Sequence, residues 1–248
     1  MKKRVLKIIL IIVGVIISVM IVLTVLVLTK IIHINKMFVS DRDIIGVDIS
    51  EFQNVVDMKK LSEQNISFVY IRATEGSTYQ DARFRENWEN AHKEGLSAGA
   101  YHFFSFDSSG EAQARNFIKT AGKQLKGDLL PVVDFEYYGD KEKNPPEKNR
   151  VLKELRIFLD IIEKEYGVKP MIYTMKNIYG KYLDGELEGY PMWVRNVFYP
   201  ADFDGWGKWT LWQYLDTAQL DGYSGGDKYI DMDVLGKNIT LEDIMIGS

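Results

Sequence analysis

Two carboxylates close an apolar run in the middle of the chain. The segment 129–136 reads LLPVVDFE, so Asp134 and Glu136 follow the apolar residues and stand two positions apart. Because side chains of a strand alternate between its faces, both carboxyls point to one side, about 6.6 Å apart along the chain. Two like charges on a buried face are costly unless one takes a proton, so we expect one raised pKa. A carboxylate beside a protonated carboxyl can catalyse glycosidic bond hydrolysis; alternatively, these acids only close the strand, one of them capping the next helix.

Two further acidic positions lie in short apolar runs. Asp48 is in the segment GVDIS (46–50) and points inward if its apolar neighbours face the helices; its other interpretation is an Asx turn at the strand end. Asp231 and Asp233 alternate with apolar residues in IDMDV (230–234). They share one face of a strand, so only one of them is needed for function.

Polar or aromatic residues end nearly every apolar run. In barrels of parallel strands, the working residues lie at the C-terminal ends of the strands. The residues at these ends are Asp48, Arg72, Glu75, Tyr101, His102, Asp134, Glu136, Tyr173, Trp193, Arg195, Gln213, Asp231 and Asp233. We expect them to face one site, because random placement on the surface would scatter them more evenly.

Short apolar runs alternate with amphipathic ones after residue 43. Runs with strand character are 44–49, 67–73, 96–104, 129–136, 170–174, 191–198, 209–214 and 228–234. Helical patterns lie at 57–65, 81–94, 110–125 and 146–166, with a weaker one at 175–183. This order favours an α/β fold with a parallel sheet. The later loops leave no room for long helices, which favours an irregular TIM-like eight-stranded barrel with helices missing after the later strands. A doubly wound open sheet is the alternative, and it would require helices after residue 200.

The residues for several other chemistries are missing from the sequence. It has no cysteine, and His33, His92 and His102 have no metal-ligand spacing. It also has no G-x-S-x-G, Walker loop or Rossmann fingerprint. We therefore expect no metal, no cofactor, and a core or supporting role for His102. Four tryptophans either pack in the core or form a sugar-stacking wall: Trp193, Trp206, Trp209 and Trp212.

The N-terminal residues form a candidate membrane anchor. Residues 8–29 carry no charge, and as a helix they span about 33 Å, enough for a hydrocarbon core of about 30 Å. A secretory signal is the alternative, but the apolar core of such a signal is usually shorter than 8–29. In addition, residues 28–33 offer no cleavage site with small residues. Four basic residues precede the span, so the positive-inside rule predicts a cytoplasmic tail at 1–7. We expect a single-pass protein of the cell membrane, with a short tether at 30–42 and an extracellular domain at 43–248.

The net charge of −4 is the sum of two unlike parts. Residues 1–40 contain six lysines and arginines and no acid, which leaves 25 basic against 35 acidic residues on 41–248. The exported part therefore carries a charge near −10. Such acidity argues against nucleic acid or an anionic lipid surface as its partner, and favours one that is neutral, cationic or held by shape.

Seven ordered sequence blocks together resemble one known family. They are GVDIS (46–50) followed by Gln53, IRATEG (71–76), GAYHF (99–103), EAQA (111–114), LPVVDFE (130–136), WQY (212–214) and IDMDV (230–234). This order is similar to glycoside hydrolase family 25, the muramidase family of cellosyl-like bacterial and phage lysozymes, over about 43–240. The resemblance implies an irregular eight-stranded barrel and cleavage of the β-1,4 bond between N-acetylmuramic acid and N-acetylglucosamine in peptidoglycan.

The resemblance also implies roles for individual residues. Glu136 matches the general acid, and Asp134 its partner, acting as nucleophile or as orienter of the substrate's N-acetyl group. Asp48 and Asp231 complete the catalytic cluster. The candidate substrate-binding residues are Tyr101, Tyr173, Trp193, Gln213, Arg72 and Glu75. Two departures stand out: Arg72 replaces a common lysine, and Glu51-Phe52 replace a common pair of histidines.

The sequence leaves the mechanism and the biological setting open. Retaining, inverting and substrate-assisted hydrolysis all remain, because a strand spacing of about 6.6 Å decides none of them. The expected partners are peptidoglycan glycan strands and, through 8–29, the membrane. A non-catalytic peptidoglycan-binding protein is the alternative class. A place in a cell-envelope secretion or conjugation complex is a further hypothesis suggested by the anchor.

Overall fold

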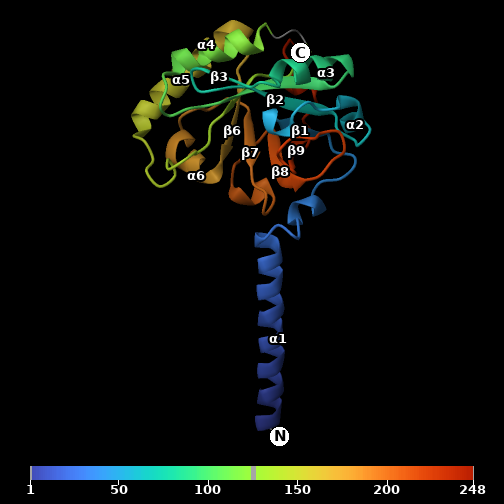
Figure 1. Ribbon diagram of the computed structural model, residues 1–248. Coiled ribbons are helices and arrows are strands. Elements are labelled where there is room, and N and C mark those ends of the chain that lie inside the picture. Colours follow the sequence, from blue (N-terminus) through green and yellow to red (C-terminus); the bar gives the residue numbers. More distant parts are fainter. Residues whose placement is uncertain (1, 124–126, 248) are drawn as a thin grey trace.

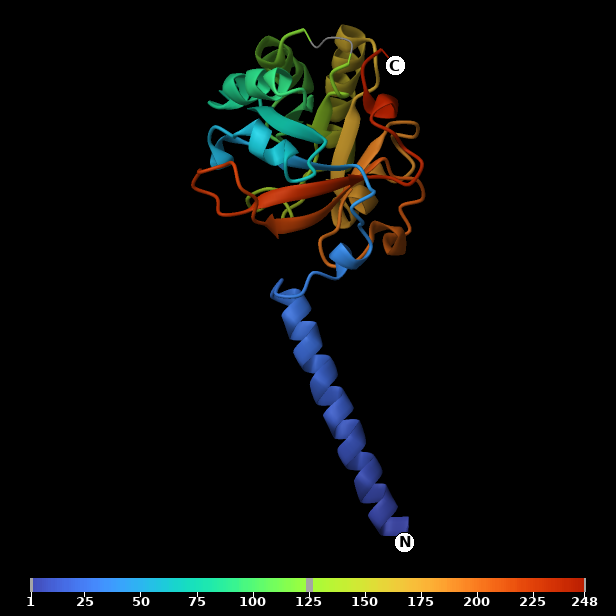
Figure 2. The same ribbon diagram turned by 90° about the vertical axis from the view of Figure 1, so that its right-hand side faces the viewer.

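The apolar N-terminal run forms one helix that stands away from the rest of the chain. The computed structural model describes residues 2–123 and 127–247. Helix α1 spans Lys2–Leu28 and projects from one side of the domain (Figures 1 and 2). It is long and apolar enough to cross a membrane, with a mean hydropathy that reaches 3.3. It contains the expected span apart from its last residue.

Eight strands close into a barrel, as predicted. The strands are β1 Ile45–Ile49, β2 Phe68–Glu75, β3 Tyr79–Gln80, β4 Ser97–Phe103, β5 Val132–Asp134, β6 Met171–Met175, β7 Met192–Arg195, β8 Leu211–Ala218 and β9 Ile230–Leu235. β1 pairs with both β2 and β9, and this double pairing closes the sheet. The two-residue β3, which the sequence did not predict, adds only to the edge of β2. The open-sheet alternative is therefore wrong.

The barrel is not parallel throughout, and this corrects the expected sheet. β9 runs antiparallel to both β8 and β1. A parallel connection needs a crossover of about a dozen residues or more, usually a helix. The link between β8 and β9, 219–229, is shorter than that and contains no helix. The chain therefore turns back, and the first residues of β9 lie at the C-terminal end of β1.

Helices cover the barrel only on the side of the earlier strands (Figure 1). They are α2 Met58–Ser62, α3 Phe84–Lys93, α4 Gly110–Ala121, α5 Lys148–Tyr166 and the short α6 Lys176–Ile178, which a π-helical turn at Tyr179–Leu183 extends. After β7, the only helical segments among the described residues are short 3-10 turns, which confirms the expected loss of helices. The predicted helix at 110–125 ends earlier, and positions 124–125 lie outside the described residues.

Two sets of buried apolar side chains fix the direction of Asp48. One set fills the barrel and includes Phe68, Tyr70, Leu129, Val132, Met171, Trp193, Leu211 and Leu235. The other lies between the strands and the helices and includes Val47 and Ile49. Since side chains alternate along β1, Asp48 points into the barrel, as predicted.

Gly110 allows α4 to pack tightly against α5. A Cβ added at Gly110 would lie 1.9 Å from the carbonyl oxygen of Glu154, which is backbone that cannot move aside. We expect Gly110→Ala to lower the free energy of unfolding by about 2–3 kcal/mol, measured by urea denaturation in detergent micelles. Gly180→Ala is the matched control, because nothing lies within 4 Å of its added Cβ. Equal stability of the two variants would contradict this packing.

Candidate active site

A cleft opens at the end of the barrel where the parallel strands finish. Its volume is about 270 Å³. Its polar lining comes from several strands and loops: Asp48, Ser50, Gln53, Arg72, Tyr101, Asp134, Glu136, Asp227 and Asp231. Asp231 stands at the beginning of β9, and not at the end of a parallel strand as we expected. It reaches the cleft because β9 is antiparallel, which places it directly opposite Asp48.

Asp134 and Glu136 lie together in this cleft, on the same side of the chain. Asp134 ends β5, and Glu136 follows in an extended segment. Burial raises the pKa of Glu136 to about 7, against the opposing charge of Arg195. Burial, and then the negative charges of Glu136 and Asp48, raise the pKa of Asp134 well above its ordinary value. The pair therefore holds a proton near neutral pH, as the strand spacing predicted.

Hydrogen bonds beneath the cleft hold Asp48. Gln213 donates from Nε2 to Asp48 Oδ2 at 2.7 Å and accepts from the Tyr173 hydroxyl at 2.9 Å. Trp193 donates from Nε1 to Asp233 at 2.9 Å. Burial raises the pKa of Asp48 to about 6, and the hydrogen bond that it shares with Asp233 opposes that rise. Burial, and then the charges of Asp48 and Asp231, raise the pKa of Asp233 well above its ordinary value.

Arg195 is a second cation beside the acids, in addition to Arg72, and sequence reasoning named it only as the end of a strand. Its Nη2 donates to Asp216 at 2.7 Å. Its charge lowers the pKa of each of four carboxyls against the effect of burial: Asp48, Asp134, Glu136 and Asp231. Without this cation, fewer of the four would ionise near neutral pH. The available signal was an arginine closing an apolar strand, which by itself does not show where the side chain points.

The candidate substrate-binding residues divide into two groups. Tyr101 and Arg72 line the cleft, and Glu75 lies at its edge, 3.9 Å from the Arg72 guanidinium. Tyr173, Trp193 and Gln213 are buried below it. Their contact with sugar stays a prediction, while their visible role is to support the acids.

Most of the tryptophans do not form a sugar-stacking wall. Trp193 is 2% exposed and lies inside the barrel, with its ring 4.9 Å from that of Tyr70. Trp206 and Trp212 are buried in the layer outside the barrel. The core-packing alternative is correct for these three residues.

The rim beside Arg72 is aromatic instead. The exposed ring of Phe52 lies 5.1 Å from the guanidinium of Arg72, and that of Tyr79 lies 5.4 Å from it. Asp81 holds Arg72 by accepting from Nε at 3.0 Å. Two positions that depart from the family pattern, 52 and 72, therefore form one continuous edge of the cleft.

His102 has a supporting role, as predicted. It is fully buried, and its ring nitrogens bond to Thr74 Oγ1 at 2.7 Å and Gln113 Oε1 at 3.1 Å. Burial lowers its pKa to about 4, so the ring is neutral at physiological pH. Within residues 2–123 and 127–247, no cluster of three or more His, Asp or Glu side chains is arranged to hold a metal ion.

The raised carboxyl pKa values predict a bell-shaped dependence of kcat/KM on pH. A general acid must carry its proton, so activity falls as pH rises through about 7, the pKa of Glu136. Asp48 must be ionised to stabilise positive charge, so activity also falls as pH drops through about 6. Initial rates on purified peptidoglycan at sub-saturating concentration check this. A rate unchanged between pH 7 and 9 would contradict the role of Glu136.

A closed α/β barrel with paired carboxyls in a cleft at its mouth fits the class of glycoside hydrolases. The sequence profile of the glycosyl hydrolases family 25 matches residues 47–223, which include Asp48, Asp134 and Glu136. The chain belongs to this family. The predicted family, fold and enzyme class, a muramidase-type glycoside hydrolase, are all confirmed.

Known relatives and solved structures agree with this assignment. The chain is 31% identical over 195 residues to lysozyme M1 of Streptomyces globisporus, covering 73% of this chain and 64% of that protein. It is 33% identical over 205 residues to the uncharacterised protein YegX of Escherichia coli K12, covering 80% and 71%. A family 25 glycosyl hydrolase structure from Bacillus anthracis matches with a TM-score of 0.74 and 42% identity, over 81% of this chain and 92% of that one. The structure of the bacterial lysozyme from Streptomyces coelicolor matches with a TM-score of 0.72 and 27% identity, over 83% of this chain and 98% of that one.

Proposed function

We propose that this protein is a peptidoglycan hydrolase that cleaves the β-1,4 bond between N-acetylmuramic acid and N-acetylglucosamine. The observation that carries the proposal is the cleft in which Glu136, with a pKa of about 7, lies beside the carboxyls of Asp48, Asp134 and Asp231. Two relatives support the choice of bond: the lysozyme of Streptomyces globisporus and the N,O-diacetylmuramidase of Arthroderma benhamiae, 29% identical over 190 residues.

Each carboxyl has a task in this reaction. Glu136 donates its proton to the glycosidic oxygen as the bond breaks. The sugar left behind develops positive charge in an oxocarbenium-like transition state, and the ionised carboxyls nearby stabilise it. Asp134, on the same side of the chain as Glu136, acts on the reacting sugar as nucleophile or as orienter of its N-acetyl group. Asp48 and Asp231 supply further negative charge from the opposite wall.

The composition of released fragments tests this function directly. The full chain in detergent micelles is incubated with purified peptidoglycan, and the products are reduced with borohydride and identified by mass spectrometry. We expect reduced muramic acid at the new ends. Reduced glucosamine ends would contradict the choice of bond. Binding without release of fragments would instead favour the non-catalytic alternative.

We also propose that α1 crosses the cell membrane, with residues 1–7 in the cytoplasm and the barrel outside. The length and hydropathy of the helix and the basic residues before it support this orientation. The chain has no cysteine, so a single introduced thiol reports its own side of the membrane. In intact cells, an impermeant maleimide is expected to label Asp140→Cys, and to label Lys3→Cys only after the cells are opened. The reverse pattern would overturn the orientation.

A complex with a secretion or conjugation machine stays a prediction. Its test is co-purification of other proteins from solubilised membranes. Recovery of this protein alone each time would count against a fixed complex.

A further inference from the structure

The segment that follows α1 lies against the barrel rather than hanging free. The backbone turns at Lys30, where Ile31 N–H bonds to the Leu26 carbonyl and Lys30 N–H to that of Val27. This is a Schellman ending, whose left-handed position is usually glycine, yet it is occupied here by Lys30 with φ of 56°. A non-glycine residue in this conformation is uncommon and persists where other contacts hold it. Its ammonium group provides such a contact.

An ion pair joins the end of the helix to the site. The Lys30 ammonium lies 2.5 Å from Asp216 Oδ2 on β8. The same oxygen accepts from Arg195 at 2.7 Å, and Arg195 faces the catalytic carboxyls. Lys30 and Asp216 are both mostly buried, so water screens this pair less than an exposed one. The carboxylate of Asp216 thus links the end of α1 to the cleft through two ion pairs, one with Lys30 and one with Arg195.

A buried asparagine secures the rest of the segment. Asn35 lies in a 3-10 turn, Ile34–Met37, and is completely buried. Its Nδ2 donates to the carbonyl oxygens of Asn196 at 2.8 Å and Tyr214 at 2.9 Å; Asn196 directly follows β7, and Tyr214 lies within β8. Leaving such a buried amide without these partners would be costly, so the two bonds hold the segment in place. The expected tether therefore lies against the barrel along much of its length.

Exposed apolar side chains gather where this segment meets the barrel. Nine large apolar residues are exposed among the described residues after position 30. Three lie near the cleft: Phe52, Tyr79 and Tyr229. The other six belong to the segment or to the loop after β7: Ile31, Ile32, Met37, Phe38, Tyr199 and Phe203. We call these six residues the apolar collar.

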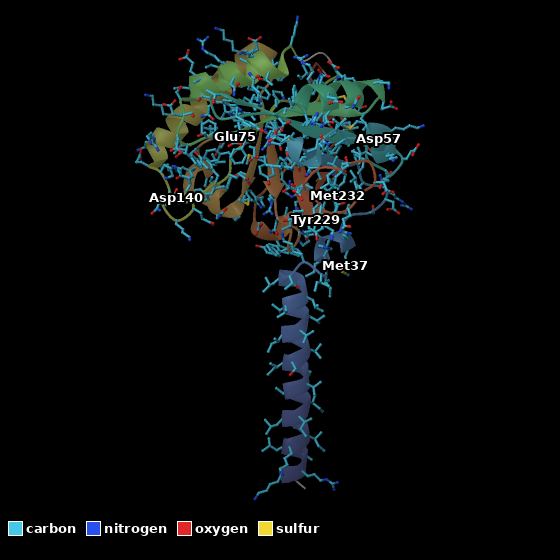
Figure 3. The ribbon with its side chains drawn as sticks, viewed as in Figure 1. Met37, Asp57, Glu75, Asp140, Tyr229 and Met232 are labelled. Carbon is cyan, nitrogen blue, oxygen red and sulfur yellow. The ribbon has the colours of Figure 1, made fainter. Side chains whose placement is uncertain are left out.

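Part of the apolar collar lies beside the point where α1 leaves the domain. Figure 3 shows Met37 beside the top of the helix, at the lower edge of the barrel. The rings of Phe38 and Phe203 meet at 6.2 Å, which joins the segment to the loop after β7. Met37 is 83% and Phe203 70% exposed, and nothing in the described protein covers them. Aromatic and apolar side chains in this position are typical of membrane–water interfaces.

The length of α1 sets the height of the collar above a bilayer. The uncharged residues 8–29 reach about 33 Å, slightly more than a hydrocarbon core of about 30 Å. Residues 30–38 then lie at the level of the lipid headgroups, and so does Phe203, which contacts Phe38. From this placement, which rests on the proposed membrane anchor, we infer that the apolar collar is a lipid-binding surface that seats the barrel on the outer leaflet.

Contact of the apolar collar with lipid differs from electrostatic attraction to an anionic membrane. The acidity of the domain argues against that attraction. The contact is formed by apolar side chains inserted at the interface, not by a basic patch. A seated barrel holds its cleft at one height and in one direction relative to the membrane. Asp216 bonds to both Lys30 and Arg195. Contact of the segment with the membrane therefore also helps to hold the Arg195 side chain in position. Wall cleavage would then be confined to glycan strands at that height.

Nitroxide labels at single introduced cysteines test the seat in the full chain. The protein is reconstituted in vesicles of phosphatidylcholine and phosphatidylglycerol, and collisions of each label with oxygen and with a water-soluble nickel chelate are measured. The labelled variants are Phe203→Cys and Met37→Cys in the collar, Phe52→Cys as an equally apolar exposed control, Lys119→Cys on the far helix α4, and Ser18→Cys within α1. We expect the ratio of oxygen to nickel collisions to be several-fold higher at both collar positions than at Phe52→Cys and Lys119→Cys.

The label at Ser18 separates failure of the seat from failure of the anchor. A lipid-exposed label there together with nickel-accessible labels at Phe203 and Met37 would overturn the seat and leave the anchor in place. A nickel-accessible label at Ser18 would overturn both. Collar labels shielded from oxygen and nickel alike would show a protein surface covering the collar, and would also overturn the proposal.

Discussion

Glu136→Gln is expected to lower kcat on peptidoglycan by about 10³-fold, because the glutamine amide cannot donate a proton to the glycosidic oxygen. The substitution keeps the size and the hydrogen-bonding shape of the side chain, so KM should change little. Single-turnover release of reducing ends measures the effect. Glu89→Gln on the exposed face of α3 is the matched control and should keep full activity. Comparable activity of the two variants would remove Glu136 from the acid role.

The stability of the same variant distinguishes lost chemistry from lost structure. The pKa of Glu136 is raised from 4.5 to about 7 in the fold, so the native state binds its proton more tightly than the unfolded chain does. Stability from this group is present below about pH 4.5 and is lost as pH rises through about 7. Glutamine stays neutral, so at pH 8 the variant should be more stable than the natural protein by about 3 kcal/mol, and equally stable at pH 4. A variant that is less stable at both pH values would indicate misfolding.

The sequence was sufficient for features that depend on local periodicity. The alternation of β5 placed Asp134 and Glu136 on one side, and the alternation of β1 turned Asp48 inward between two apolar neighbours. The end of α5 was predictable from an equally local feature, because Gly167 takes the left-handed conformation that stops the helix. Each of these results follows from a few consecutive residues and needs no knowledge of the rest of the chain.

Features that depend on tertiary placement were not predictable in the same way. The direction of β9 depends on the length of a loop and on which strands are free to pair, so Asp231 was assigned to the wrong end of its strand. Asp233 and Arg195 stood among the strand ends, but spacing does not show which charges converge. Asn35 lies in a segment with no helical or strand period, so nothing local marked it as buried. Its burial depends on carbonyl oxygens far along the chain.

Asp134→Asn is expected to lower kcat by about 10²-fold, the second largest effect at this site. The asparagine keeps the volume of the carboxyl but removes the negative charge beside the reacting sugar. Asp134 Oδ1 is buried and has no hydrogen-bond partner within the described residues, so no protein donor neutralises its charge. The change should fall on kcat and leave KM nearly unaltered, because the lost charge matters most in the transition state. A rise in KM alone would indicate a binding role instead.

Azide rescue of Asp134→Ala decides between the two roles that the sequence left open for this residue. Burial and the charges of Glu136 and Asp48 raise the pKa of Asp134 well above its ordinary value, which makes its carboxylate a strong acceptor for the N–H of a substrate N-acetyl group. We therefore expect Asp134 to orient the N-acetyl group, whose oxygen then attacks the sugar carbon, and to stabilise the positive charge that forms on that group. Small anions cannot replace this function, so azide should restore no activity to Asp134→Ala. Restored turnover with a glycosyl azide product would identify Asp134 as the nucleophile, because azide would then occupy the place of its missing carboxylate.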